Sequence, residues 1–361
     1  MAHLVKKKWV SEDLGLTGRS QQCEYEAYIP DELTGRSFTF TGECAADVAE
    51  AEAAIRSLNV TATVLTSADR LAHLLLRAEA AASSRIEGMI IGANRLLRAE
   101  AARDLGVAAQ RDGLAHEVIA NIDAMTAAMT VADAANEITT DSILGIHHTL
   151  LKDTDLGDYA GKPRTGPGWI GGNAYEPCAA SFVPPPHYEI LRLLDDLAAF
   201  CNDDSLPAVA QAAISHAQFE TIHPFVDGNG RTGRALIHVI LRRRGLAPCW
   251  CPPVSLVLAT LNRDYIKGLT SYRFVGPHDA PEAVEGLNRW VSLFSRACTR
   301  SVRDAEAFEQ QVRDVQEKWR DRLGPVRRDS AADLLIDELP RYPVITVNGH
   351  SYAHRKSKNT N

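Results

Sequence analysis

The sequence predicts a mostly α-helical protein, and two observations support this fold class. Residues 46–135 are rich in Ala, Leu, Glu and Arg and contain few prolines or β-branched runs, a composition that favours helix. Proline and glycine gather instead in one segment, residues 164–186, which breaks the helical pattern. With 361 residues and 45% hydrophobic content, the chain is long enough for two or three domains.

The expected elements follow the chain in order. Residues 1–45 mix aromatic residues with polar turns and suggest an irregular arm laid across a helical body. The helix that begins near residue 68 is expected to end at Gly88, because glycine readily adopts the left-handed backbone that follows a helix. Further helices are expected over residues 113–130, 139–152, 187–202, 206–222, 231–244, 255–271, 280–300 and 303–322.

The segment 164–186 predicts a β-hairpin, with short apolar strands at 169–170 and 181–183 around a turn-rich centre. The C-terminal residues begin as a helix, become strand-like at "VITV" (344–347) and end in a polar, basic tail. We therefore divide the chain into N-terminal helices (1–135), a central domain (136–297) and a C-terminal helical segment (298–361).

Charge and cysteine usage limit the partners and the compartment. The chain has 39 basic and 46 acidic residues, and a net charge of -7 gives no general attraction to nucleic acid or anionic membranes. The seven cysteines lack the paired spacing of a zinc site or a disulfide framework, which favours free thiols in a reducing cytoplasm. The first residues, "MAHLVKKKWVSEDLG", have lysines but no apolar stretch after them, so we do not expect them to act as a signal peptide. No apolar run approaches about 18 residues. We expect a soluble, cytoplasmic protein with no membrane partner.

The stretch "HPFVDGNGRTGR", His223 to Arg234, carries the strongest functional signal. Pro224 disfavours helical backbone at His223, so the preceding helix is expected to end there and leave the imidazole at a loop edge. Gly228 and Gly230 allow the backbone to approach a ligand closely. A new helix is expected to begin near Arg231, with its free N–H groups facing the loop. These features predict an anion site.

Two arginines and one carboxylate complete this site. Arg231 and Arg234 stand three residues apart, so both can lie on one helix face and hold phosphate oxygens. Asp227 supplies the single carboxylate that a phosphate-bridging Mg²⁺ commonly takes from protein. The patterns "GPGWIG" and "GNGRTG" fit a dinucleotide fingerprint, but neither lies between a buried strand and a helix, so we reject that interpretation.

The stretch resembles the signature of Fic-domain proteins, HPFx(D/E)GNGRxxR, at every specified position. The resemblance implies a helical core with a β-hairpin flap and a protein adenylyltransferase activity, in which AMP passes from ATP to a hydroxyl of a target protein. It implies that His223 is the catalytic base and that Asp227 binds Mg²⁺. The nucleotide-binding residues that it implies are Gly228, Asn229, Gly230, Arg231, Thr232, Gly233 and Arg234, with Tyr265 as the candidate at the adenine.

Other stretches resemble larger Fic proteins in the same order, among them "YEAYIP", "SSRIEG", "IHHTLL" and "AQFETIHPF". Residues 164–186 correspond to the flap, which would dock an extended segment of a target protein by strand addition. "SSRIEG" is similar to the family's inhibitory motif (S/T)xxxE(G/N), in which the glutamate pairs with the second arginine of the signature and blocks the γ-phosphate site. The implied inhibitory residues are Ser83, Glu87 and Gly88, and the implied docking residues are Trp169, Ile170, Gly171, Phe182 and Val183.

Several alternatives stay open at this stage. The same residues would suit a deAMPylating hydrolase in which Glu87 positions water, and a non-enzymatic nucleotide-sensing regulator or adaptor is the third hypothesis. The target, the modified side chain and a homodimer are not decided by the sequence. Residues 331–348 resemble the start of a winged helix, but the stretch after Cys298 is too short for a complete one, so we do not expect a nucleic-acid partner.

Overall fold

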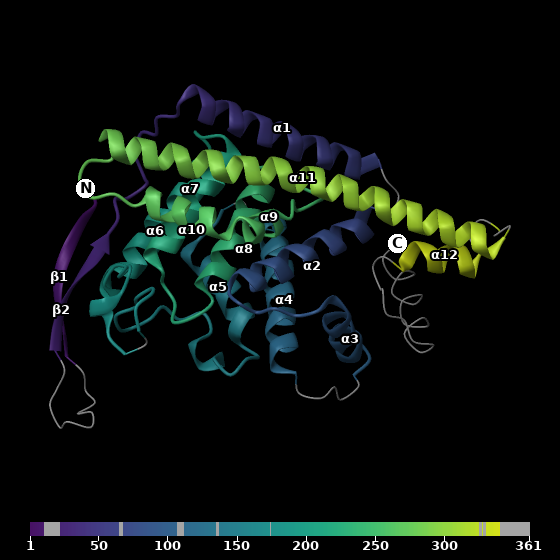
Figure 1. Ribbon diagram of the computed structural model, residues 1–361, viewed down its shortest axis with the longest axis horizontal. Coiled ribbons are helices and arrows are strands. Elements are labelled where there is room, and N and C mark those ends of the chain that lie inside the picture. The colour runs from purple at the N-terminus through teal and green to yellow at the C-terminus, as the bar shows by residue number, and fades with distance from the viewer. Residues whose placement is uncertain are drawn as a thin grey trace.

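The protein is described by a computed structural model that covers residues 1–10, 22–64, 68–106, 112–134, 137–173, 175–324, 327 and 330–339. In this part of the chain the fold is mostly helical, with one two-stranded antiparallel sheet (Figure 1). The predicted fold class, a helical core with an N-terminal helical extension and a short C-terminal helix, is confirmed. The "VITV" stretch and the basic tail lie outside the described residues.

The N-terminal arm is a β-hairpin, which corrects the expected irregular structure. Strand β1 (His3–Val10) pairs with β2 (Gln22–Ile29), and His3 lies opposite Ile29. Along β1, exposed and half-buried side chains alternate, and most of β2 shows the same alternation. This is the period of two that a half-buried strand requires. Part of this signal is present in the sequence, as the alternation of polar and apolar residues at the start of "QCEYEAYI".

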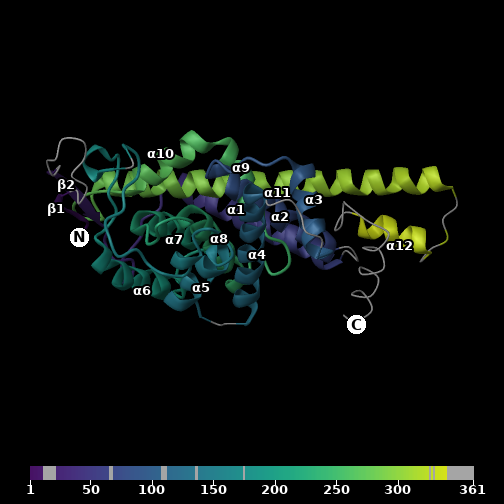
Figure 2. The ribbon, with the colours of Figure 1, turned by 90° about the horizontal axis from the view of Figure 1, so that it is seen from below.

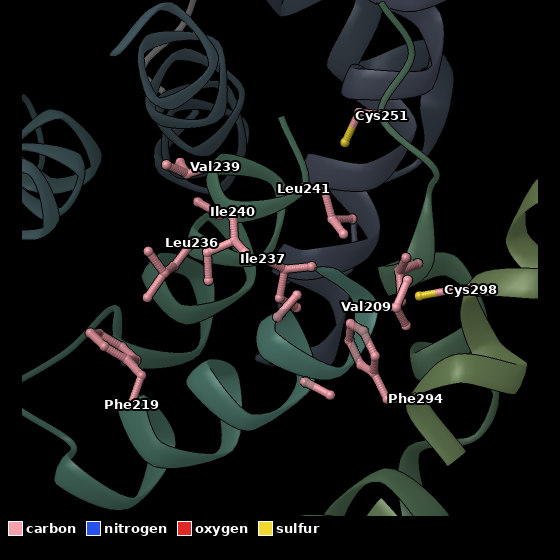
Figure 3. Close-up of a cluster of buried hydrophobic side chains, with 14 of the residues drawn as sticks. Val209, Phe219, Leu236, Ile237, Val239, Ile240, Leu241, Cys251, Phe294 and Cys298 are labelled. Carbon is pink, nitrogen blue, oxygen red and sulfur yellow. The ribbon is translucent and has the colours of Figure 1, made fainter. Parts of the chain in front are cut away.

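Helices α7 and α8 form the centre of the molecule. Every residue of α7 (Ala208–Ile222) is buried, and α8 (Asn229–Arg243) is buried from its first residue to Leu241. Apolar side chains such as Phe219, Leu236 and Ile240 fill the space between them (Figure 3). The surrounding helices are α1 (Gly42–Val64), α2 (Ala68–Ile86), α3 (Ala93–Asp104), α4 (Gly113–Ala134), α5 (Thr140–Leu151) and α6 (Ile190–Cys201).

The C-terminal helices differ from the expected boundaries. The helix expected over 255–271 is two helices, α9 (Val254–Thr260) and α10 (Asn262–Tyr272), separated at Leu261. The two helices expected over 280–300 and 303–322 are one, α11 (Pro281–Leu323). No glycine or proline interrupts α11 between Leu287 and Leu323, so nothing in the local sequence ends it.

Helix α11 extends beyond the body of the protein, as both views show (Figures 1 and 2). Its first half packs along α1, where the side-chain amide of Asn288 bonds the backbone of Thr39 and Thr41. Near its end, Arg320 forms ion pairs with two aspartates of α12 (Ala331–Glu338), which folds back against it. No helix in the described part of the chain is long and apolar enough to span a bilayer.

The predicted hairpin at 164–186 is reduced to a single bridge. Ile170 pairs with Phe182 in antiparallel fashion, and the Ile170 N–H donates to the Phe182 carbonyl at 2.8 Å. A short 3₁₀ turn, Pro177–Ala179, lies within the loop between them. The predicted strands are therefore shorter than expected, but the loop does reverse direction where the sequence indicated.

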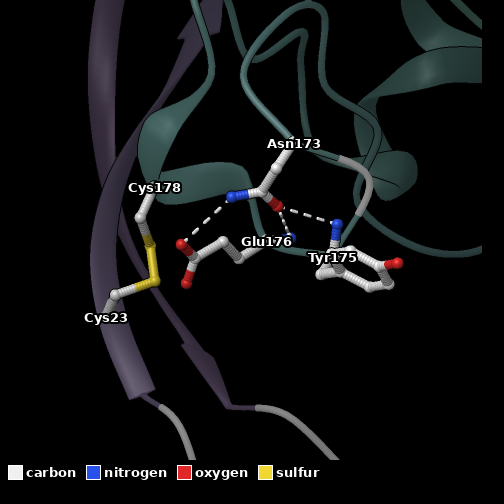
Figure 4. The surroundings of a disulfide bond; sticks show 5 residues. All are labelled: Cys23, Asn173, Tyr175, Glu176 and Cys178. Carbon is white, nitrogen blue, oxygen red and sulfur yellow. Dashed lines mark hydrogen bonds between the residues drawn. A yellow bond between two sulfur atoms is a disulfide. The ribbon is translucent and has the colours of Figure 1, made fainter.

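A disulfide joins this loop to the N-terminal hairpin (Figure 4). It links Cys23 of β2 to Cys178, 155 residues further along the chain, and corrects the expectation that these thiols are free. Cys44, Cys201, Cys249, Cys251 and Cys298 do carry free thiols. Spacing in the sequence could not reveal this bond, because its two cysteines meet only through the tertiary fold.

Loss of this bond is expected to destabilise the protein, because a long closed loop restricts the unfolded chain. We expect Cys178→Ser to lower the free energy of unfolding by about 2–4 kcal/mol in urea titrations without reductant. With excess dithiothreitol, parent and variant are expected to unfold at the same urea concentration. Equal midpoints without reductant would mean that the bond does not form in the folded protein.

Candidate functional site

The turn between α7 and α8 places His223 in an unusual backbone conformation. Its φ of 48° and ψ of 61° make it the one non-glycine residue with positive φ among the described residues. Pro224 excludes ordinary helical backbone at this position, and α7 ends there as predicted. The N–H of His223 donates to the Phe219 carbonyl at 2.9 Å, and its own carbonyl accepts from Arg164. These contacts hold the imidazole at the edge of the loop.

The loop that follows is shaped by Gly228 and Asn229. Gly228 has a φ of 76°, a conformation that favours glycine, and a Cβ there would lie 2.9 Å from the Leu150 side chain. Both the backbone conformation and the lack of space therefore require glycine. The Asn229 amide exchanges two hydrogen bonds with the backbone of Phe225, at 2.8 and 2.9 Å, and so closes the loop itself. Because Gly228 has no side chain to cap α8, the first N–H groups of that helix face the loop without a side-chain cap.

Arg231 is a buried cation with unused donors. It is 1% exposed, and its Nη2 donates to the Asp227 carboxylate at 2.8 Å. Its Nε and Nη1 have no hydrogen-bond partner, although the Glu117 carboxylate lies 3.9 Å from Nη1. The buried hydroxyl of Thr232 also has no partner. Buried donors are normally satisfied, so this helix start is built to receive an anion.

Arg234 is held by the end of α2. Its Nη2 donates to the Glu87 carboxylate at 2.7 Å and to the Ser83 carbonyl at 2.8 Å, and its Nε donates to the Ser83 hydroxyl at 2.8 Å. Gly88, with a φ of 83°, follows the helix end as the sequence indicated. A Cβ on Gly230 would lie 1.9 Å from the Glu87 carboxylate oxygen. The carboxylate therefore lies directly over the first turn of α8.

Gly233 is fixed by packing on its other side. A Cβ at this position would lie 2.8 Å from the Phe219 ring and 3.0 Å from a Glu220 carboxylate oxygen. Its role is therefore to let α8 approach α7 closely. The sequence placed Gly233 with the phosphate-binding residues, and the contacts show a packing constraint at this position.

Tyr265 lies behind Arg234 and not at an exposed surface. It is 4% exposed, its hydroxyl is 2.8 Å from the His216 Nε2 and 3.5 Å from the Arg234 Nη1, and its ring packs beside Trp290. The expectation that its ring contacts the adenine stays a prediction. Its hydroxyl supports the arginine, and His216 is the core residue that the sequence indicated.

The imidazole of His223 is neutral near pH 7. Burial, together with the positive charges of Arg164 and Arg273, lowers its pKa to about 4. Its Nδ1 has no hydrogen-bond partner, and the nearest carboxylate oxygen, from Glu220, is 3.8 Å away. Burial raises the pKa of Glu220 to about 7. A neutral imidazole beside an anion site can accept a proton from a hydroxyl.

Two residues that shape the loop were not assigned this role from the sequence. The His147 ring stacks on Phe225 with centroids 3.6 Å apart, and its Nε2 lies 3.0 Å from the Asp227 carbonyl. Arg164 binds the His223 carbonyl from the other side. No motif marks them, because each acts through a backbone atom distant in sequence.

Two family models match the chain. The Fic/DOC family model matches residues 137–241, and the Fic/DOC family N-terminal model matches residues 45–130. The chain belongs to the Fic/DOC family. The first of these matches contains the whole of the α7–α8 turn, and the second contains Ser83 and Glu87.

Curated relatives of this Fic/DOC protein carry the name protein adenylyltransferase. The chain is 36% identical over 120 residues to protein adenylyltransferase fic-1 of Caenorhabditis briggsae, which is 32% of this chain and 22% of that protein. It is 43% identical over 68 residues to a probable protein adenylyltransferase of Aquifex aeolicus, 19% of this chain and 21% of that protein. The match thus spans about a fifth of the length of these relatives.

Solved structures share the Fic/DOC fold. A Fic family protein from Desulfovibrio desulfuricans G20 superposes with a TM-score of 0.58 at 22% identity, over 88% of this chain and 91% of that one. Fic-1 from C. elegans superposes with a TM-score of 0.54 at 21% identity, over 74% of each chain. At these identities the likeness concerns the fold.

The buried histidines of this Fic/DOC protein predict acid lability. Burial lowers the pKa of His147 and His223 to about 4 and that of His216 to about 3, whereas an unfolded histidine titrates near 6.5. The unfolded chain then binds more protons between pH 6.5 and 4, so stability is present above pH 6.5 and is lost as the pH falls through this window. The carboxyl groups of Glu100 and Glu220 act in the opposite direction. Their pKa values are raised in the folded protein, so the folded state binds their protons more tightly and gains stability as the pH falls.

Between pH 7 and pH 5, each of these three histidines becomes protonated in the unfolded chain and stays neutral in the folded protein. We expect each one to lower the free energy of unfolding over this range by roughly 1 kcal/mol or more. Urea titrations at pH 7, 6 and 5 measure the total, and NMR titration of the imidazole carbons separates the rings. Histidine signals at these three positions that titrate near pH 6.5 in the folded protein would contradict the prediction.

Proposed function

We propose that this protein is a self-inhibited protein adenylyltransferase that transfers AMP from ATP to a hydroxyl side chain of a target protein. The observation that carries the proposal is the α7–α8 turn, where a neutral imidazole lies at the edge of a helix start with buried, unsatisfied arginine donors. The names of the curated relatives support the same reaction.

The residues of the turn account for each part of this transfer. His223 accepts the proton of the target hydroxyl, whose oxygen attacks the α-phosphorus of ATP. The bond from that phosphorus to the β-bridging oxygen breaks, and pyrophosphate leaves. Arg231, Arg234 and the N–H groups at the start of α8 stabilise the negative charge that develops on the phosphates. The Ile170 N–H and carbonyl already bond the 181–182 segment, so a target segment would pair with the side of this bridge that faces away from Phe182.

The site fits a Mg²⁺ ion bound together with the nucleotide. Asp227 is 47% exposed and its carboxylate accepts from Arg231 on one oxygen. A single carboxylate beside phosphate-binding donors is the usual protein share of a nucleotide-bound magnesium. Asp227 would hold the ion, which when bound offsets phosphate charge.

Glu87 accounts for the proposed self-inhibition. Its carboxylate occupies the space over Gly230 and takes one donor of Arg234. A triphosphate that needs this arginine must then bind with its leaving group out of line with the attacking oxygen, and the transfer is suppressed. Glu87 is 37% exposed, so its side chain can leave the arginine without unfolding the helix.

Removing the Glu87 carboxylate is expected to release the activity. Glu87→Gly frees Arg234 for phosphate, and we expect self-AMPylation to rise by about 10- to 100-fold over the parent. The measurement is intact mass of the purified protein after incubation with Mg²⁺ and ATP, scored as additions of AMP. Equal modification of parent and variant at saturating ATP would contradict the inhibitory contact.

Two further variants separate inhibition from catalysis. Adding His223→Ala to Glu87→Gly is expected to reduce transfer by about 10²–10⁴-fold, because the catalytic base is lost. Arg234→Ala breaks the same contact as Glu87→Gly but also removes a phosphate ligand, so it is not expected to activate. An Arg234→Ala protein as active as Glu87→Gly would argue against the proposed phosphate site.

The magnesium assignment has its own test. Loss of a residue that only supports a metal ligand lowers metal affinity by about 10–100-fold, and loss of a direct ligand should cost at least as much. We therefore expect Asp227→Ala in the Glu87→Gly background to raise the Mg²⁺ concentration needed for half-maximal transfer at least tenfold. The measurement is transfer rate against Mg²⁺ concentration at fixed ATP. Asp158→Ala, which removes an exposed carboxylate elsewhere, is the matched control. An unchanged Mg²⁺ requirement in Asp227→Ala would exclude this ligand.

A further inference from the structure

Arg164 lies at the start of the segment 164–186, the flap, and binds both of its ends. Its Nη1 donates to the Gly166 carbonyl at 2.8 Å, and its Nη2 donates to the Pro185 carbonyl at 2.6 Å. The two ends of the flap are thus held by one planar group. Gly168 lies against the same guanidinium, since a Cβ there would be 3.0 Å from the Arg164 Nε.

The same side chain also reaches the catalytic turn. The Arg164 Nε donates to the His223 carbonyl at 3.0 Å, and its backbone N–H donates to the Pro224 carbonyl at 2.9 Å. These acceptors are the two residues that create the left-handed end of α7. Arg164 therefore connects the flap to the backbone that carries the imidazole.

The burial of the charged Arg164 side chain costs folding free energy. It is 6% exposed, and its guanidinium donors bind carbonyl oxygens; the ion pairs of the described residues include none with Arg164. Burial lowers its pKa to about 10. A buried cation without an anionic partner is unfavourable, and a lysine could not bond in the three directions of the guanidinium fork. The geometry of the fork is therefore the property that this position requires.

We propose that Arg164 is a positioning residue that joins the flap and the His223 backbone into one rigid unit, so that a hydroxyl docked on the flap meets the imidazole. This inference rests on the proposed transfer reaction. Arg164 does not touch the phosphate-binding residues of α8 through any of its hydrogen bonds. Its loss therefore affects the alignment of acceptor and base, and a misplacement of about 1 Å can reduce a rate by about 10²-fold.

The test compares Arg164→Lys and Arg164→Met in the Glu87→Gly background. We expect Arg164→Lys to lower the maximal rate of self-AMPylation by about 10- to 100-fold and Arg164→Met to lower it further, with the KM for ATP within about twofold of the background. Arg244→Lys is the matched control, because this half-buried arginine bonds Gln211 at the far end of α8. A variant with the full maximal rate would overturn the proposal, as would one in which KM for ATP and thermal midpoint change together with the rate.

A second measurement does not depend on the transfer reaction. Amide hydrogen exchange of Arg164→Lys without the Glu87 change is expected to be at least about tenfold faster in both the flap and the 223–228 loop, and unchanged in α11. Faster exchange in the flap alone would overturn the coupling. If Glu87→Gly itself carries no AMP, the proposed function fails, while the exchange experiment still decides whether Arg164 joins the two segments.

Discussion

The site depends on one backbone constraint, the proline that follows His223. Pro224 ends α7 and leaves His223 in the left-handed conformation, while Gly228 starts α8 after a short loop. Because α7 and α8 are almost entirely buried, the direction of both helices is fixed by the core, and the turn cannot relax without moving them. The strained residue persists because its surroundings determine its backbone, which is the usual condition for strain at a functional site.

The relation between α2 and α8 follows from two contacts of their side chains, in which the carboxylates differ greatly in burial. Glu79 of α2 pairs with His238 of α8 at 2.8 Å, both at most 1% exposed, and the Glu79 carboxylate also accepts from the Ser255 N–H and hydroxyl. Two turns further along α2, Glu87 pairs with Arg234 at 37% exposure. Breaking a buried pair is costly, whereas a partly exposed carboxylate can exchange its partner for water. Helix α2 is thus held at Glu79, and of the two contacts the one between Glu87 and Arg234 has the more exposed carboxylate.

The sequence was most informative where the chemistry is local. The α7–α8 turn follows from residue types at fixed spacings, although α8 begins at Asn229, two residues before the expected start. The contact between Glu87 and Arg234 was implied by the family resemblance, and the structure places the two side chains together. Features that depend on tertiary contact could not be predicted in this way: the Cys23–Cys178 bond joins segments that are distant in the sequence. The β1–β2 hairpin differs from the expected irregular arm, because the alternation of "QCEYEAYI" indicates a strand whereas "HLVKKKWV" has no such alternation.

The flap contains one β-bridge, but several contacts attach it to the rest of the protein. Arg164 holds its two ends, the Tyr28 N–H of β2 donates to the Val183 carbonyl at 2.9 Å, and the disulfide joins β2 to Cys178. Arg273 adds a contact from beyond α10, with its guanidinium 3.6 Å from the centroid of the Phe182 ring. A strand that is already ordered loses little conformational entropy when a partner segment pairs with it. The attachments therefore hold the Ile170–Phe182 bridge in place without a longer hairpin.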